Sequence, residues 1–430
     1  MKYGRGELRL LVPPENVAGV YRPRARQRRV AAEADAGGRQ ILNAALAASH
    51  LEDSVAGRRV TLLVSDATRE EPRDSVIGAV GPFLRAAREI RLVAATGSHD
   101  SRSPATLALV QAIEGLLGRA GVRVSRVLEH DAVRGPFTSF GTTTRGTPIE
   151  VSAEAMETDV FVILSDMKPH YFAGYSCPPK SVFPGLASMA AIEANHAHTL
   201  DPDSRAGFHP WHPDPGRRTN PLAADYLEAC ERAVAGRPVL ALAFGSSGNE
   251  VFWAEAGELR RVTSAGMTRT DEIAHVSTPP ARFAVISPGG HPNDVDLYIA
   301  QRALELCGGA VEDGGDILFL CECPDGIGPA HTVEAFWNPL RGSLVQAAAT
   351  PAGPYRLYSH KAIRFARLLL RLSALHLHAS IAPDEIASAH MVAVTDPQAV
   401  IGEWLVMDPD ARILLFDGAS KLSVSRSPES

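Results

Sequence analysis

Short apolar runs, separated by segments long enough for a helix, constrain the fold of this chain more than any other feature. Each run has four to six residues and is rich in β-branched side chains, and the stretch from 105 to 120 has the length of a helix. Such runs are typical of strands buried in a parallel sheet. They lie at residues 59–64, 90–94, 160–164, 283–286, 317–320 and 412–416. The pattern predicts an α/β protein with mostly parallel sheets.

The chain length of 430 residues favours two domains, at roughly 100–200 residues per domain. The segment 275–280 ends in two prolines just before a predicted strand and has the character of a linker. We therefore expect an N-terminal domain over 1–275 and a C-terminal α/β domain over 276–404. We expect the tail from about 405 to 430 to pack back on the first domain.

Charge and hydropathy exclude several classes of protein. The net charge is −6, which gives no electrostatic reason to bind nucleic acid or an anionic membrane. The most apolar long stretch, 364–378, is interrupted by Arg367 and Arg371, and the first ten residues lack the apolar core of a signal peptide. We expect a cytoplasmic protein that binds neither nucleic acid nor a membrane, with its five cysteines reduced.

Polar residues directly follow three of the predicted strands. They are Ser65, Asp66, Thr68 and Arg69 after the first strand, His99 after the second and His170 after the third. Parallel sheets bind ligands at the carboxyl ends of their strands, so these side chains are expected to face one crevice. Two histidines can act as acid and base on one substrate carbon, and an arginine offers a planar fork for a carboxylate.

A second dense group of polar residues lies between 168 and 198. Lys180 stands between Pro178–Pro179 and Ser181, which indicates a fixed backbone with a specific task, and His196 follows in the next helix. The glycine spacing is not that of a phosphate-binding P-loop.

These segments, and others along nearly the whole chain, resemble the lactate racemase family. Their order and spacing together, rather than any single motif, make the resemblance specific. The matching segments are 65–69, 95–99, 129–131, 141–148, 170–174, 180–185, 195–196, 287–294, 297–298 and 360–362.

The resemblance implies an isomerase that racemises or epimerises a 2-hydroxy acid in a crevice between two α/β domains. It implies a nickel-pincer nucleotide tethered covalently to Lys180 in the N-terminal domain, with His196 as the nickel ligand. Enzymes that make the cofactor and insert nickel would be partners, and protein produced without them would be an apo form.

The resemblance also assigns roles around the substrate. His99 and His170 match the two acid/base histidines. Arg69 and Asp66 match the loop that contacts substrate and cofactor; we place Arg69 with the catalytic residues, and Asp66, Ser65 and Thr68 with those that bind the cofactor.

Several departures from the family concern the substrate. After Tyr298, which matches an active-site tyrosine, this chain has Ile299 and Arg302 where lactate racemases have glutamine and lysine. Cys177–Pro179 replaces a glycine-rich stretch, and the segment 220–225 lacks the family's histidine and glutamate. Tyr355 or Tyr358 is a candidate for the aromatic side chain of the pocket. We therefore expect a 2-hydroxy acid other than lactate.

Two other functions remain open. His99, His170 and His196 could hold the zinc ion of a hydrolase, and the histidines at 198, 209 and 212 are further candidate ligands. The two domains could also bind a small molecule without turning it over. The chemical state of Lys180 discriminates among the three hypotheses.

Overall fold

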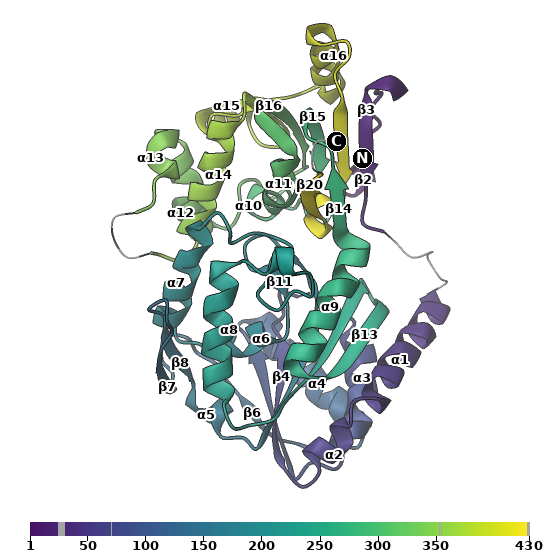
Figure 1. The fold of residues 1–430 in the computed structure, drawn as a ribbon, viewed down its shortest axis with the longest axis vertical. Helices are drawn as coiled ribbons and strands as arrows, with labels where there is room; N and C mark the ends of the chain where they lie inside the picture. The colour runs from purple at the N-terminus through teal and green to yellow at the C-terminus, as the bar shows by residue number, and fades with distance from the viewer. Residues whose placement is uncertain (25–30, 70, 352, 354, 428–430) are drawn as a thin grey trace. The chain divides into compact units, whose positions relative to one another are not determined.

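The computed structural model describes residues 1–24, 31–69, 71–351, 353 and 355–427, and it divides into two compact units (Figure 1). We call the first the central unit; it comprises residues 25–168 and 172–270. The second, the terminal unit, comprises residues 1–24, 169–171 and 271–430 and so contains both chain ends. Each unit is described by itself.

The central unit is built on a six-stranded sheet in the order β13-β12-β9-β4-β5-β6, in which only β13 is antiparallel to its neighbour. The strands are β4 (Arg59–Ser65), β5 (Glu89–Ala95), β6 (Val124–Leu128), β9 (Val160–Asp166), β12 (Val239–Ser247) and β13 (Glu250–Glu258). The middle strands β4, β5 and β9 are apolar and almost fully buried, which explains why the sequence pattern detects them.

The helices of the central unit and its short strands complete the core. The helices are α1 (Ala31–Ala47), α2 (Leu51–Val55), α3 (Arg73–Leu84), α4 (Pro104–Arg119), α5 (Ala153–Met156), α6 (Pro179–Val182), α7 (Met189–Ala197), α8 (Pro221–Val234) and α9 (Leu259–Ala274), which runs into the terminal unit. Strands β7 (Phe137–Thr142) and β8 (Pro148–Ser152) form a hairpin, and β11 (Gly174–Ser176) precedes α6. Strand β10 (Lys168–His170) begins in the central unit and ends in the terminal unit. Side chains of α1, α3 and α4 pack with those of β4, β5 and β9 in one apolar cluster.

The terminal unit has its own six-stranded sheet, parallel throughout, in the order β18-β17-β16-β15-β19-β3. Its strands are β3 (Val17–Tyr21), β15 (Ala281–Ser287), β16 (Val311–Leu320), β17 (Ala374–His378), β18 (Val392–Ala393) and β19 (Ile413–Asp417). Two small strand pairs lie outside this sheet: β1 (Lys2–Tyr3) pairs with β2 (Gly6–Glu7), and β14 (His275–Thr278) pairs with β20 (Ser423–Arg426). Its helices are α10 (Leu297–Ala300), α11 (Arg302–Cys307), α12 (Ala330–Leu340), α13 (Leu344–Ala348), α14 (Ser359–Arg371), α15 (Pro383–Ser388) and α16 (Pro397–Met407). Phe283 stacks on Trp404 in its core at 4.8 Å.

The predicted fold class is confirmed, and all six predicted strands are present, as β4, β5, β9, β15, β16 and β19. The division of the chain differs from the expected domains. Residues 1–24 and the tail from 405 to 427 lie in the terminal unit, because β3 pairs with β19 and β19 pairs with β15 (Figure 1). The tail was expected on the first domain and is not there. The segment expected as a linker forms β14 in the terminal unit. An apolar run indicates a strand, but it does not indicate which sheet the strand joins.

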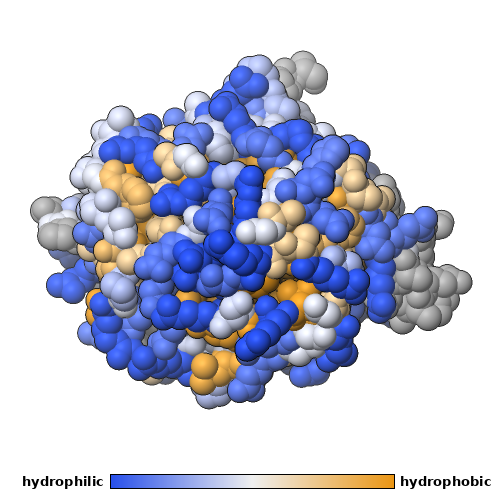
Figure 2. Space-filling view, turned by 90° about the horizontal axis from the view of Figure 1, so that it is seen from below, coloured by the Kyte–Doolittle hydropathy of each residue, from blue (hydrophilic) through white to orange (hydrophobic). Residues whose placement is uncertain are grey.

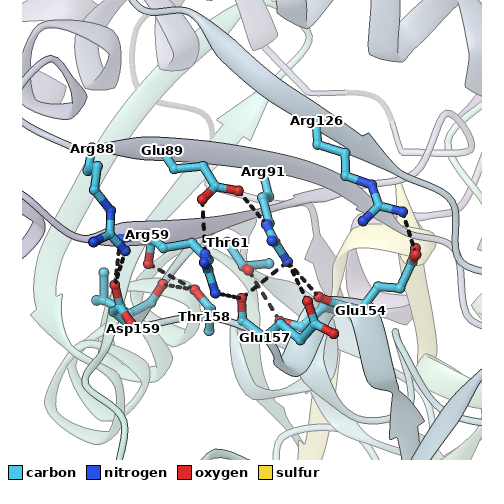
Figure 3. A network of polar contacts seen from close by, with 12 residues as sticks. Arg59, Thr61, Arg88, Glu89, Arg91, Arg126, Glu154, Glu157, Thr158 and Asp159 are labelled. Carbon is cyan, nitrogen blue, oxygen red and sulfur yellow. Dashed lines mark hydrogen bonds and ion pairs between the residues drawn. The ribbon is translucent and has the colours of Figure 1, made fainter.

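An ion-pair network closes the amino ends of the central strands, opposite to the ends that carry the polar candidates (Figure 3). Glu89 accepts hydrogen bonds from Arg59 at 2.9 Å and from Arg91 at 2.7 Å. Arg91 also donates to the carboxylate of Glu157 at 3.2 Å. The network therefore joins β4, β5 and the segment before β9 and stabilises the sheet away from the candidate site.

The face shown in Figure 2 is mostly hydrophilic, and its hydrophobic side chains stand in small groups among polar ones. None of the helices in the described part of the chain is long and apolar enough to cross a membrane.

Candidate functional site

Asp66 and His99, which follow neighbouring strands β4 and β5, meet at the carboxyl edge of the central sheet. One carboxylate oxygen of Asp66, Oδ2, lies 2.5 Å from Nδ1 of His99. The other, Oδ1, accepts hydrogen bonds from the backbone N–H of Thr68 at 2.9 Å and from its hydroxyl at 2.5 Å. A carboxylate in this setting has both of its oxygens occupied.

The pairing sets the protonation of the His99 ring. Burial of Asp66 opposes ionisation, but the hydrogen bond and charge of His99, with Thr68 and Arg69, lower the pKa of this carboxyl below its usual value. An ionised carboxylate only accepts hydrogen bonds, so Nδ1 of His99 carries a proton, and in the neutral form of the ring the lone pair is on Nε2. The His99 side chain is 41% exposed, so Nε2 can receive a proton from a bound molecule.

Lys180 lies in the short helix α6, between β11 and α7, rather than in an open loop. Its backbone carbonyl accepts from Gly185 N–H at 2.9 Å, and Gly97 N–H in turn donates to the Gly185 carbonyl at 2.9 Å. A side chain at Gly185 would come within 2.4 Å of the Ser181 carbonyl oxygen, so this turn requires glycine. The loop after β5 and the turn after Lys180 are thus held together.

The Lys180 ammonium is in a setting that disfavours its charge. Burial lowers the pKa of Lys180 to about 8, and the positive charge of Arg69 acts in the same direction. At pH 7 roughly a tenth of this amine is therefore uncharged and nucleophilic, far more than for an ordinary lysine. The effect of Arg69 also means that its guanidinium belongs to the same local site.

His196 lies in the last turn of α7, close to Lys180. Nζ of Lys180 is 6.0 Å from the centre of the Phe172 ring, and the Phe172 and His196 rings are 5.6 Å apart. Burial and the Lys180 charge lower the pKa of His196 to about 4, so its imidazole is neutral. Nδ1–H of His196 donates to the Ile192 carbonyl at 2.9 Å, which leaves the lone pair on Nε2.

The central unit therefore brings together most of the predicted residues. Ser65 also lies in this region, but its side chain bonds with Glu71. The predicted residues of this unit are Ser65, Asp66, Thr68, Arg69, His99, Lys180 and His196.

The remaining predicted residues lie in the terminal unit. His170 stacks on Tyr171 with ring centres 5.3 Å apart. The Tyr298 ring lies 6.4 Å from that of Tyr358, and Nε of Arg302 donates to the carbonyl of Ile299 at 3.1 Å. Tyr298 and Ile299 lie in the short helix α10, and Arg302 begins α11. The carboxylate of Asp296 caps α10 by accepting from the Ile299 N–H at 2.6 Å.

Sequence reasoning missed four charged or aromatic residues near these candidates. Phe172 adjoins both Lys180 and His196. Nζ of Lys361 lies 3.3 Å from the Tyr298 ring centre and donates to the Tyr298 carbonyl at 2.8 Å. Glu71 is buried, which raises its pKa to about 7, and Lys168 pairs with Asp166 at 2.6 Å. Phe172 and Lys168 each lie two residues from His170, and Lys361 follows His360, which is the signal that could have drawn attention to them.

Within the described ranges, no three histidine, cysteine, aspartate or glutamate side chains are grouped so as to hold a metal ion. The zinc-hydrolase alternative, which needs such a ligand set from the protein, therefore gains no support.

Comparisons with known proteins agree on one family. Residues 3–207 match the family model of the lactate racemase N-terminal domain. The lactate racemase of Thermoanaerobacterium thermosaccharolyticum is 27% identical over 343 residues, covering 78% of this chain and 76% of that protein. The lactate racemase of Lactiplantibacillus plantarum is 24% identical over 357 residues, with 79% of each chain covered.

Solved structures show the same fold. The structure of the lactate racemase apoprotein from Thermoanaerobacterium thermosaccharolyticum superposes with a TM-score of 0.81 at 23% identity and covers 99% of both chains. The crystal structure of a protein from Thermotoga maritima gives a TM-score of 0.61 at 17% identity, over 91% of this chain and 98% of that one.

Proposed function

We propose that the substrate of this chain is a 2-hydroxy acid other than lactate. The chain belongs to the lactate racemase family and is an isomerase of the racemase and epimerase type. We further propose that it works with a nickel-pincer nucleotide attached to Lys180. The replacement of the family's glutamine and lysine by Ile299 and Arg302 supports the difference in substrate.

The observation that carries the proposal is that Lys180 and His196 lie close to each other and both adjoin the Phe172 ring. The amine of Lys180, with its pKa lowered to about 8, is suited to covalent attachment at neutral pH. The neutral His196 ring, protonated at Nδ1, has a nitrogen of the type that binds Ni(II). One protein ligand suffices where the cofactor supplies the others, so the residues fit the group. When bound, the cofactor would accept the hydride of C2 and return it.

The protein residues would supply proton transfer and orientation. Nε2 of His99, held by Asp66, would take the hydroxyl proton of one enantiomer as the 2-keto acid forms, and His170 would serve the other enantiomer. Arg69 would bind the carboxylate through its planar guanidinium, and Asp66, Ser65 and Thr68 would form the loop that contacts the cofactor.

The terminal-unit residues would define the substrate pocket. Tyr298 and Tyr358 offer aromatic surface. Ile299 stands where lactate racemases have the amide of a glutamine, and Arg302 presents a planar guanidinium where they have the ammonium of a lysine. A panel of 2-hydroxy acids and aldonic acids, analysed by chiral chromatography after incubation of either stereoisomer, identifies the substrate.

The decisive experiment is peptide and intact mass analysis of protein co-expressed with the enzymes that make the cofactor and insert nickel. We expect a mass addition on Lys180 together with bound nickel, and the loss of both in Lys180→Ala. Lys421→Ala, which removes an exposed lysine of the terminal unit, is the matched control and should keep both. Zinc retained without any addition on Lys180 would reject the proposal.

A further inference from the structure

Residues 169–171 pack with the terminal unit, although the chain on both sides of them belongs to the central unit. This three-residue segment contains His170. The ring of His170 is only partly buried, whereas Tyr171 beside it is 7% exposed. The contacts of Tyr171 therefore explain why the segment lies where it does.

Tyr171 is held at its hydroxyl and on its ring. Its Oη lies 3.1 Å from Nε2 of His360 in helix α14, and the two rings are 6.3 Å apart. The guanidinium of Arg364, one turn further along α14, lies 6.0 Å from the Tyr171 ring centre. Arg364 is itself fixed by two hydrogen bonds to one oxygen of Glu305, at 2.9 and 2.7 Å.

His360 also bonds to a second tyrosine, Tyr355, so three side chains are linked in a row, which we call the Tyr355–His360–Tyr171 line. Its Nδ1 lies 2.5 Å from Oη of Tyr355. A neutral imidazole has one donor and one acceptor nitrogen, so one phenol donates to the ring of His360 and the other accepts from it. Burial keeps the pKa of Tyr171 well above its usual value, and the nearby Tyr298 and Glu305 act in the same direction against Arg364 and Arg302, so its phenol stays protonated.

The line Tyr355–His360–Tyr171 ends under the ring of His170. The His170 and Tyr171 rings are nearly parallel, with 7° between their planes and 5.3 Å between their centres. Because the hydroxyl of Tyr171 is bonded and its ring is packed, the plane of Tyr171 is determined by the terminal unit. The His170 ring stacks on the ring held in this plane.

We propose that Tyr171, His360 and Tyr355 are positioning residues, which fix the orientation of the His170 ring through contacts made within the terminal unit. The catalytic meaning of this orientation rests on the proposed function, in which His170 is an acid/base. The orientation itself does not depend on that function.

The first test is NMR of the full-length protein labelled with ¹³C in its histidine rings. A His170→Gln variant assigns the His170 signal. We expect that signal and its pH titration to move in Tyr171→Phe and in Tyr355→Phe, which each remove only a hydroxyl from the line. Tyr21→Phe, which changes a tyrosine stacked on Phe416, and His390→Gln, which changes a histidine bonded to the Gly342 carbonyl, are the controls and should leave it unchanged.

The second test is the pH profile of kcat/KM in the cofactor-loaded enzyme. Misplacement of a catalytic group by about 1 Å can cost about 100-fold in rate, so we expect about a tenfold loss in Tyr171→Phe and a larger one in Tyr171→Leu, with a displaced pH profile. A merely structural contact would lower the melting temperature without displacing the profile.

An unchanged His170 signal and titration in both Tyr171→Phe and Tyr355→Phe would overturn the inference. If no variant, nor the wild type, racemises any acid of the panel, the proposed function fails and the NMR result alone decides the positioning role. His360→Gln adds a third variant that interrupts the same line at its centre.

Discussion

Replacement of Asp66 by asparagine is the sharpest test of how His99 is set up for proton transfer. Oδ1 of Asp66 accepts from both the backbone N–H and the hydroxyl of Thr68, at 2.9 and 2.5 Å. In Asp66→Asn the amide oxygen must keep that position, because a backbone N–H cannot accept a hydrogen bond. The amide NH2 is then left at the position of Oδ2, 2.5 Å from Nδ1 of His99.

The change reverses the tautomer of the His99 ring. Facing an NH2 donor, Nδ1 becomes the acceptor, and the proton of the neutral ring moves to Nε2. A ring protonated at Nε2 cannot serve there as a base. General-base catalysis contributes about 100-fold to 10,000-fold. Because the His99 side chain is 41% exposed, water relieves part of the constraint, so we expect the lower end, about 100-fold or about 2.7 kcal/mol in kcat/KM.

The assay is racemisation followed from each stereoisomer, with the load of cofactor measured on the same samples by intact mass. Asp131→Asn is a matched control, since Asp131 is also an ionised carboxylate of the central unit, whose pKa is lowered to about 2 by Arg134 and nearby backbone N–H groups. Activity of Asp66→Asn within about twofold of the wild type at equal cofactor load would refute the tautomer argument.

Three further predictions concern the metal, the pH and the sheet. His196→Ala is expected to keep the mass addition on Lys180 and to lose nickel, measured by metal analysis; retained nickel would contradict the ligand role. Burial lowers the pKa of His130 to about 4 and that of His209 to about 3 in the folded protein. Below about pH 6.5 these histidines therefore bind protons in the unfolded chain but not yet in the folded protein, which stabilises the unfolded state. The melting temperature should therefore fall between pH 6.5 and 4, less steeply in His130→Phe, and a constant melting temperature would contradict this. Glu89→Gln should lower the free energy of unfolding in urea by about 1 kcal/mol, an effect that weakens with added salt, because it interrupts the network of Figure 3.

The strands could be predicted where their signal was local. β4, β5 and β9 are buried on both faces and consist mostly of apolar residues, so the sequence alone marks them. β6, at the edge of the central sheet, has three exposed residues among its five and shows no such run. The place of β19 in the terminal sheet could not be predicted, because it depends on pairing with β15 and β3, which lie far away in the chain.

The candidate site, like the strands, could be predicted only in part from the sequence. Position after a strand was enough to select Asp66 and His99, since parallel topology alone brings strand ends to one edge, whereas His170, selected in the same way, packs with the terminal unit. The sequence did not reveal that Asp66 bonds to His99 or that Phe172 adjoins both Lys180 and His196. Those contacts depend on side-chain directions, for which a linear pattern carries no signal.

His170 illustrates what this difference means for mutagenesis. Its position in the chain suggests that it belongs with Lys180, ten residues later, yet its neighbour Tyr171 bonds to a histidine 189 residues away. Changes in α14, which carries His360 and Arg364, should therefore act on His170, whereas changes in α7 should act on His196. In a chain that crosses between two compact units, the unit that orients a side chain is determined by its contacts and not by its place in the sequence.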